Sequence, residues 1–118
     1  MSRLRPVPLP RIRGSQIGLK KPWMVDQIKA DMRSGRYEFQ EIRGRIGGVR
    51  DRRGRYHVLE GHHRMVAALE IYFETGDTGP VQNLIRWGVW NHQEHGPLFN
   101  RPLPFRNWWG AFRNWLGV

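Results

Sequence analysis

The chain has 118 residues, enough for one domain with a modest core and too few to favour two. It carries 20 Lys and Arg residues against 10 Asp and Glu residues, and the net charge of +10 favours a polyanionic partner, with an unspecialised basic surface as the alternative. Because there is no cysteine, disulfides, thiolate zinc sites and thiol catalysis are excluded, and no apolar run approaches the ~20 residues of a membrane helix or forms a signal peptide.

Residues 1–21 are rich in proline and arginine and predict an extended arm. Within it, residues 7–12 form an edge strand at most, because proline cannot donate to a ladder. A helix is predicted over 22–33, with Met24, Ile28 and Met32 on one stripe, Val25 alongside, and a stop at Ser34-Gly35.

Two antiparallel strands are predicted over 41–50 and 55–59, joined by the polar loop 51–54 that ends in glycine. A second helix is predicted over 62–75 and closed by Gly76. Its apolar residues match the helical template throughout: Met65, Ala68, Leu69, Tyr72 and Phe73.

A further strand is predicted over 81–87, after a turn at 77–80. Beyond Gly88 a polar and proline-interrupted stretch leads to Trp108, Ala111, Phe112, Trp115 and Leu116 at helical spacing. Core packing of these tryptophans is favoured over base stacking, and an unburied stripe would form a docking patch. The fold class is therefore α+β, a small mixed sheet with a tryptophan-rich C-terminal helix. Residues 1–118 form one domain, divided into an arm (1–21), a core (22–88) and an extension (89–118).

The turn from the hairpin into the second helix has the chemistry of an anion site. Gly61 ends the strand, and the first helical turn offers unpaired backbone N–H groups and the positive end of the helix dipole. Glu60 adds a carboxylate, His62 and His63 titrate near neutrality, and Arg64 is a fixed cation. These residues predict phosphodiester cleavage, with His63 or His62 moving a proton and Glu60 orienting or acting as base.

The metal requirement stays open. Carboxylates are scattered along the chain, which disfavours a two-metal site, and adjacent histidines diverge on a helix instead of sharing a metal. One Mg²⁺ held by Glu60 and the phosphate fits equally well. Arg43 and Arg45, on the neighbouring predicted strand, extend the phosphate grip.

Each of these residues also has a structural interpretation. Glu60 is then a surface carboxylate or helix cap, the two histidines serve capping and packing, and the two arginines belong to a solvated strand face. The other three histidines are assigned structural or surface positions: His57, His92 and His95.

The order strand, helix, hairpin, Glu-Gly-His-His-Arg, helix, strand resembles the ParB/sulfiredoxin superfamily over residues 7–87. The resemblance implies nucleotide or nucleic-acid phosphates at this loop, with Glu60 in the acidic position, Gly61 at the turn, His63 as the family histidine and Arg64 as the phosphate clamp. Sulfiredoxin-like members have a nucleophilic cysteine where His62 stands, so that chemistry is absent. Chromosome-partitioning members use a different charged signature and a separate DNA-binding domain that this chain has no room for.

Further segments look like the ParB-type toxin domains at the C-terminal ends of polymorphic secreted bacterial toxins, including Rhs and contact-dependent inhibition proteins. They are Gly-Arg-Ile-Gly-Gly at 44–48, Thr-Gly-Asp at 75–77, Arg-Pro-Leu-Pro at 101–104 and Trp-Trp-Gly-Ala at 108–111. The likeness implies delivery by a larger toxin into the target-cell cytoplasm, nuclease activity and a cognate immunity protein, which the basic charge suggests is acidic.

The predicted function is thus an antibacterial nuclease toxin, with DNA favoured over RNA. A nucleotide-hydrolysing or phosphotransfer enzyme is the first alternative. A non-catalytic nucleic-acid-binding module is the second, and its binding would fall steeply with salt while the nucleic acid stays whole.

Overall fold

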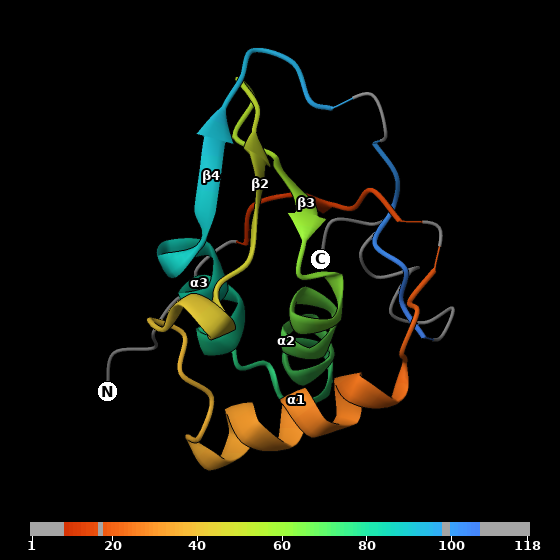
Figure 1. The fold of residues 1–118 in the computed structure, drawn as a ribbon, viewed down its shortest axis with the longest axis vertical. Coiled ribbons are helices and arrows are strands. Elements are labelled where there is room, and N and C mark those ends of the chain that lie inside the picture. The colour runs from red at the N-terminus through yellow and green to blue at the C-terminus, as the bar shows by residue number, and fades with distance from the viewer. Residues whose placement is uncertain (1–8, 17, 98–99, 107–118) are drawn as a thin grey trace.

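Three α-helices and a four-stranded mixed sheet make up the part of the chain that the computed structural model describes, residues 9–16, 18–97 and 100–106. In chain order the elements are β1 (Ile12–Arg13), α1 (Trp23–Ser34), the 3-10 helix η1 (Ile42–Gly44), β2 (Gly47–Arg50), β3 (Tyr56–Glu60), α2 (His62–Thr75), α3 (Gly79–Trp87) and β4 (Val89–His92). The helices gather on one side, and the β2–β3 hairpin projects away from them (Figure 1). The predicted α+β class is confirmed, whereas the predicted tryptophan-rich helix at 108–116 lies outside the described residues.

The sheet has the order β1-β3-β2-β4 and contains both strand orientations. β2 and β3 pair antiparallel as predicted, while β1 is parallel to β3 and β4 is parallel to β2. The carboxylate of Asp51 closes the hairpin by accepting the backbone N–H groups of Arg53 (2.9 Å) and Arg55 (3.0 Å). The first hairpin strand is shorter than predicted, because residues 42–44 form η1 and pairing begins only at Gly47. β1 is a two-residue edge strand, as the prolines beside it require.

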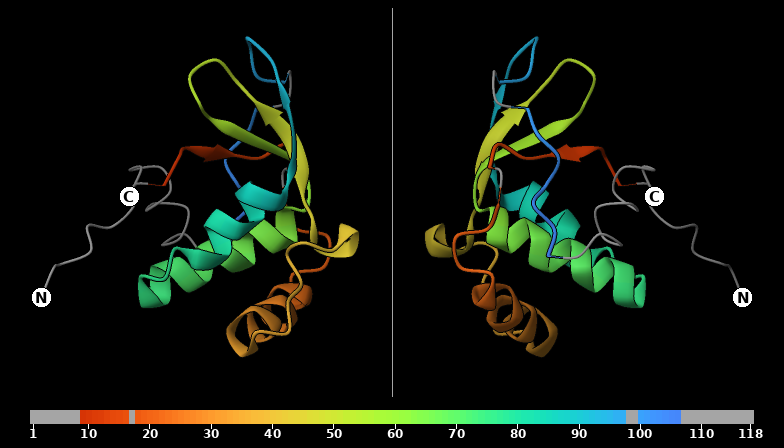
Figure 2. Two further views of the ribbon diagram at one scale, coloured as in Figure 1. Left: turned by 90° about the vertical axis from the view of Figure 1, so that its left-hand side faces the viewer. Right: turned by 90° about the vertical axis from the view of Figure 1, so that its right-hand side faces the viewer.

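Helix α2 is the central element of the fold and has the predicted bounds. Met65, Ala68 and Leu69 are buried as predicted, while Tyr72 and Phe73 are only half-buried. The helix also buries residues outside the predicted stripe, including Val66, Ala67 and Ile71. Contacts with α1, α3 and β3 explain this, since a helix covered on several sides buries more than one face. Figure 2 shows α2 and α3 running side by side beneath the strands.

Helix α1 begins and ends within one residue of the prediction, and its predicted apolar face is confirmed except at Met24. Val25, Lys29 and Met32 face the core, whereas Met24 is 39% exposed. Lys29 is buried because its Nζ pairs with Glu70 on α2 at 3.1 Å. Arg106, from the C-terminal segment, binds the same carboxylate. Of the predicted stripe, Met32 is buried and Ile28 is packed against the core, so the buried Lys29 is the feature that hydrophobicity alone did not predict.

The strand predicted over 81–87 is wrong, because Gly79–Trp87 is helix α3. Pro80 lies in its first turn, where a missing N–H costs nothing, and Val81 and Leu84 are buried at helical spacing. The edge strand beside β2 is β4, which was not predicted from the sequence. No helix in the described ranges is long and apolar enough to cross a bilayer.

Candidate phosphate-binding site

The turn between β3 and α2 has a geometry that requires glycine. Gly61 has φ +98°, and a Cβ built on it would lie 2.3 Å from Cγ2 of Ile46. The first intrahelical hydrogen bond runs from Met65 N to Gly61 O (3.1 Å), so the three preceding N–H groups have no acceptor within the helix. Among the described residues no side chain caps this end. The start of α2 therefore presents unpaired donors and a positive dipole end, which favour an anion.

His62 is part of the core and not of an open surface. His62 is 1% exposed, and its Nε2 accepts a hydrogen bond from the backbone N–H of Ser15 at 3.0 Å. The Ser15 hydroxyl donates to the carbonyl of Val58 (3.1 Å) and also lies 3.3 Å from the same Nε2. Burial, followed by the neighbouring His63, lowers the pKa of His62. We conclude that His62 fixes the segment after β1 against the start of α2.

His63 is the more accessible of the two histidines. It is half-buried, and its Nε2 accepts the backbone N–H of Lys21 at 3.0 Å. Burial, then the charges of Lys21 and Arg64, lower its pKa below the ordinary histidine value. A histidine with this shift is neutral at pH 7 and keeps a basic nitrogen. Accepting through Nε2 places its proton on Nδ1.

The arginines fall into two groups. Arg64 is half-buried, and its Nη1 reaches the carbonyl of Arg45 (3.4 Å), while Arg45 Nε donates to the carbonyl of Gln40 (3.0 Å). Arg43 lies exposed on η1, and its side chain makes no hydrogen bond or ion pair within the described ranges. The prediction that Arg43 and Arg45 share a neighbouring strand is therefore wrong, because both precede β2. Of the two, Arg45 is connected to the turn, but through its backbone carbonyl, while its guanidinium is bonded to Gln40.

Glu60 is the last residue of β3 and is exposed. Its carboxylate has no hydrogen-bond or ion-pair partner in the described part of the chain. Nor does that part bring together three His, Asp or Glu side chains able to hold a metal. A magnesium ion on Glu60 would accordingly complete its shell with phosphate oxygens and water.

Sequence reasoning missed the two backbone donors at the histidines. Ser15 and Lys21 lie 47 and 42 positions from their histidine partners, and no local pattern marks a backbone N–H as a partner. His57, assigned a structural or surface position, is fully buried, with Nε2 2.8 Å from the Asp51 carboxylate. His92 and His95 are exposed.

Comparison of the chain with protein-family models, with curated proteins and with solved structures finds no match in any of the three. The resemblance to the ParB/sulfiredoxin superfamily and its toxin branch stays a prediction from sequence motifs. Function has to be argued from the residues at the start of α2 and from the charge of the chain.

Proposed function

We propose that this domain cleaves phosphodiester bonds in nucleic acid, with the scissile phosphate bound at the first turn of α2. A net charge of +10 attracts a polyanion, and the uncapped helix end supplies backbone donors for one phosphate. Arg64 adds a guanidinium at the same turn. Together these groups stabilise the negative charge that develops on the phosphate oxygens during attack.

The observation that carries the proposal is the state of His63. Burial and two neighbouring cations keep this half-buried side chain neutral at pH 7, which a general base requires. In the proposed mechanism the water oxygen bonds to phosphorus as Nε2 takes its proton. The P–O bond to the leaving sugar oxygen breaks, and that oxygen takes a proton back from protonated His63 or from solvent. In the structure the backbone N–H of Lys21 donates to Nε2 of His63. When substrate binds, the attacking water replaces Lys21 as the hydrogen-bond donor to Nε2.

Glu60 and His62 have different parts in this scheme. The exposed Glu60 carboxylate orients the water or holds a magnesium ion beside the phosphate. His62, buried against Ser15, is a positioning residue that sets the path of the segment leading to Lys21. The reaction therefore assigns proton transfer to His63 alone.

The biological setting follows from the sequence resemblance only. On that basis we propose an antibacterial toxin domain that prefers DNA to RNA and is delivered by a larger protein. An acidic immunity protein would neutralise it, because a basic phosphate-binding surface attracts acidic side chains as well as nucleic acid.

The test is to incubate the purified domain with plasmid DNA, total RNA and ATP in parallel, with magnesium or with EDTA. Variants His63→Ala and Arg64→Ala are compared with His95→Ala and Arg53→Ala, whose side chains are exposed; Arg53 lies in the hairpin loop, at the opposite end of β3 from the turn. We expect polymer breakdown that is lost in the first pair and retained in the second. Circular dichroism of each variant checks that the fold persists.

Other outcomes would replace the proposal. ATP turnover with intact polymers would identify a nucleotide-hydrolysing enzyme. Salt-dependent binding without turnover of any substrate would leave a binding module. Breakdown that persists in both His63→Ala and Arg64→Ala would move catalysis away from this turn.

A further inference from the structure

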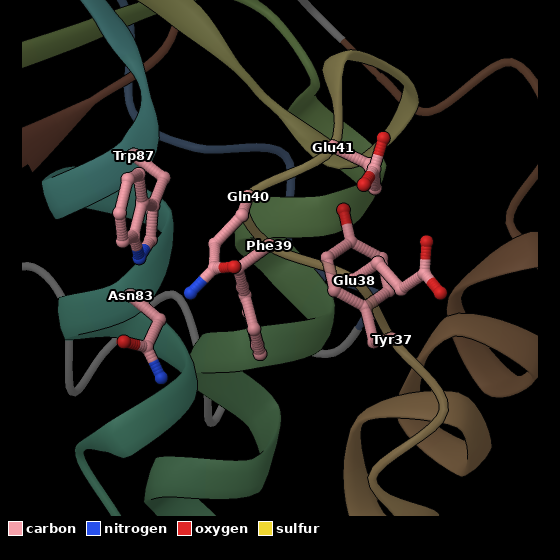
Figure 3. Close-up of a pocket in the computed structure, with 7 residues that line it drawn as sticks. All are labelled: Tyr37, Glu38, Phe39, Gln40, Glu41, Asn83 and Trp87. Atoms are coloured by element: carbon pink, nitrogen blue, oxygen red, sulfur yellow. The ribbon is translucent and has the colours of Figure 1, made fainter.

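A concave pocket lies between the loop before η1 and helix α3. It has a volume of about 380 Å³, within the range of about 300–1,000 Å³ usual for small-molecule sites. Figure 3 shows Asn83 and Trp87 projecting from α3 on one side, with Phe39 and Gln40 opposite them. Asn83 and Trp87 are four residues apart, so one helix face presents both.

The lining differs from the rest of this basic protein. It contains two carboxylates, Glu38 and Glu41, and no lysine or arginine, so it is unsuited to a phosphate. It does contain the aromatic rings of Phe39 and Trp87. Flat aromatic surfaces beside side-chain amides suit a planar ligand with hydrogen-bonding edges.

The amides in the pocket are available to such a ligand. Gln40 and Asn83 make no side-chain hydrogen bond within the described residues, and the Gln40 amide is directed toward α3 (Figure 3). Each amide offers a carbonyl acceptor and an NH₂ donor. Tyr37 fixes the loop that carries them, because its hydroxyl donates to the Gly44 carbonyl at 2.6 Å. Burial raises the pKa of Tyr37 to about 12, so the hydroxyl stays protonated at neutral pH.

The pocket is connected to the start of α2 through one residue. Arg45 donates from its guanidinium to the Gln40 carbonyl, and its own carbonyl accepts from Arg64. These two hydrogen bonds join Arg64, Arg45 and the Gln40 backbone in one chain, so the proposed phosphate site and the pocket belong to neighbouring parts of the fold. The two sites would recognise different parts of a nucleotide. Arg64 and the start of α2 bind the phosphate, and the aromatic and amide side chains of the pocket contact a base.

We propose that the pocket lined by Phe39, Gln40, Asn83 and Trp87 binds an unpaired nucleobase. The base stacks on Trp87, and the two amides contact its polar edge. The inference rests on the proposed function in taking nucleic acid as the ligand. It adds a specificity for single-stranded or splayed-out nucleotides, because a base inside a duplex does not expose its face.

The test measures binding of a labelled eight-nucleotide single-stranded DNA by fluorescence anisotropy, in EDTA and at several salt concentrations. The matching duplex and the free mononucleotides are measured beside it, and they distinguish a strand-bound base from a free nucleotide. We expect Trp87→Ala to weaken single-strand binding about 5- to 140-fold, the equivalent of about 1–3 kcal/mol, and Trp87→Phe to retain most of the affinity. Trp23→Ala is the matched control, since Trp23 is 67% exposed on α1.

Salt separates the two sites. Trp87→Ala, Asn83→Ala and Gln40→Ala should lower affinity without changing the salt slope, whereas Arg64→Ala should reduce that slope by about one phosphate contact. The two amide variants test the pocket even if Trp87→Ala does not fold. Single-strand binding within twofold of the unmodified protein in both amide variants, with Trp87→Ala equally unaffected or unfolded, would overturn the inference.

The outcomes also distinguish this inference from the proposed function. Pocket-dependent binding by a protein that leaves DNA and RNA intact would keep the nucleobase site and remove the nuclease. Cleavage that is lost in His63→Ala, together with pocket variants that bind normally, would do the reverse. Equal affinity for duplex and single strand would also remove the nucleobase site.

Discussion

The start of α2 and the pocket beside α3 differ in how their side chains are engaged. At the start of α2, His62 and His63 both accept backbone N–H groups from a distant segment, and Gly61 packs on Ile46 without space for a Cβ. In the pocket, the amides of Gln40 and Asn83 have no hydrogen-bond partner among the described residues. The histidines of the first region are tied into the fold. In the second region Tyr37 is bonded to Gly44 and Arg86 lies over the Trp87 ring, but the two amides have no partner within the described part of the chain to give up when a ligand binds.

This difference predicts where stability and function separate. Substitutions at the start of α2 should lower the stability of the fold, the cleavage rate or both, because its histidines and glycine already make contacts within the fold. Substitutions of the pocket amides should affect binding alone. Each prediction below tests one side of this contrast, beginning with the largest expected effect.

His63→Ala should lower the cleavage rate by about 10²–10⁴-fold, the usual contribution of a general base. The pH dependence has a defined sign. Because the pKa of His63 is lowered, the side chain is neutral around pH 7, and the rate of the unmodified protein should fall only at pH values below the ordinary histidine pKa. Initial rates across pH check this, and a rate that falls as pH rises would contradict a base role.

Gly61→Ala should destabilise the protein by roughly 3 kcal/mol. A left-handed residue with a Cβ costs about 1–2 kcal/mol, and overpacking against Ile46 adds about 1–3 kcal/mol. Gly54→Ala is the matched control: it has φ +79° but open space around its Cβ, so only the conformational cost applies. Denaturant unfolding compares them, and equal losses would show that the contact with Ile46 is unimportant.

Asp51→Asn tests the other end of β3 and should cost about 2 kcal/mol, since charge-assisted hydrogen bonds to Asp51 are weakened. Burial by itself raises the pKa of Asp51, but hydrogen bonds from His57 and Arg55 outweigh it and hold the pKa below its ordinary value. Its contribution is therefore present above the unfolded pKa and is lost as pH falls through the lower folded value. Unfolding measured below about pH 5 should show a smaller acid loss in Asp51→Asn.

Asn83→Ala should change the free energy of unfolding by less than about 0.5 kcal/mol, because its side chain has no hydrogen-bond partner within the described residues. Asn91→Ala, an exposed change on β4, provides the comparison. Thermal unfolding of both variants would show whether the pocket amides contribute to the stability of the fold. A loss as large as that of Asp51→Asn would break the contrast between the two regions.

Much of the core could be predicted because its signals are local. The bounds of α2 followed from its apolar period and from the glycines at both ends, and the hairpin followed from a polar loop between two apolar runs. The strand predicted over 81–87 failed because a short apolar run has no decisive period, and Pro80 in the first turn was the missed helix signal. That error also hid the pocket, because Asn83 and Trp87 are about 6 Å apart along a helix but would be about 13 Å apart along a strand.

The sequence by itself determined the basic charge, the limits of α2 and the Glu-Gly-His-His-Arg turn, because each depends on composition or on residues close along the chain. Only the tertiary structure decided which histidine is buried, which arginine joins the turn and which stripe of α1 faces inward. Those outcomes depend on Ser15, Lys21, Arg45 and Glu70, whose contacts come from distant segments. Burial and hydrogen-bond partners are properties of packing, and packing brings together groups whose separation along the chain leaves no local pattern to read.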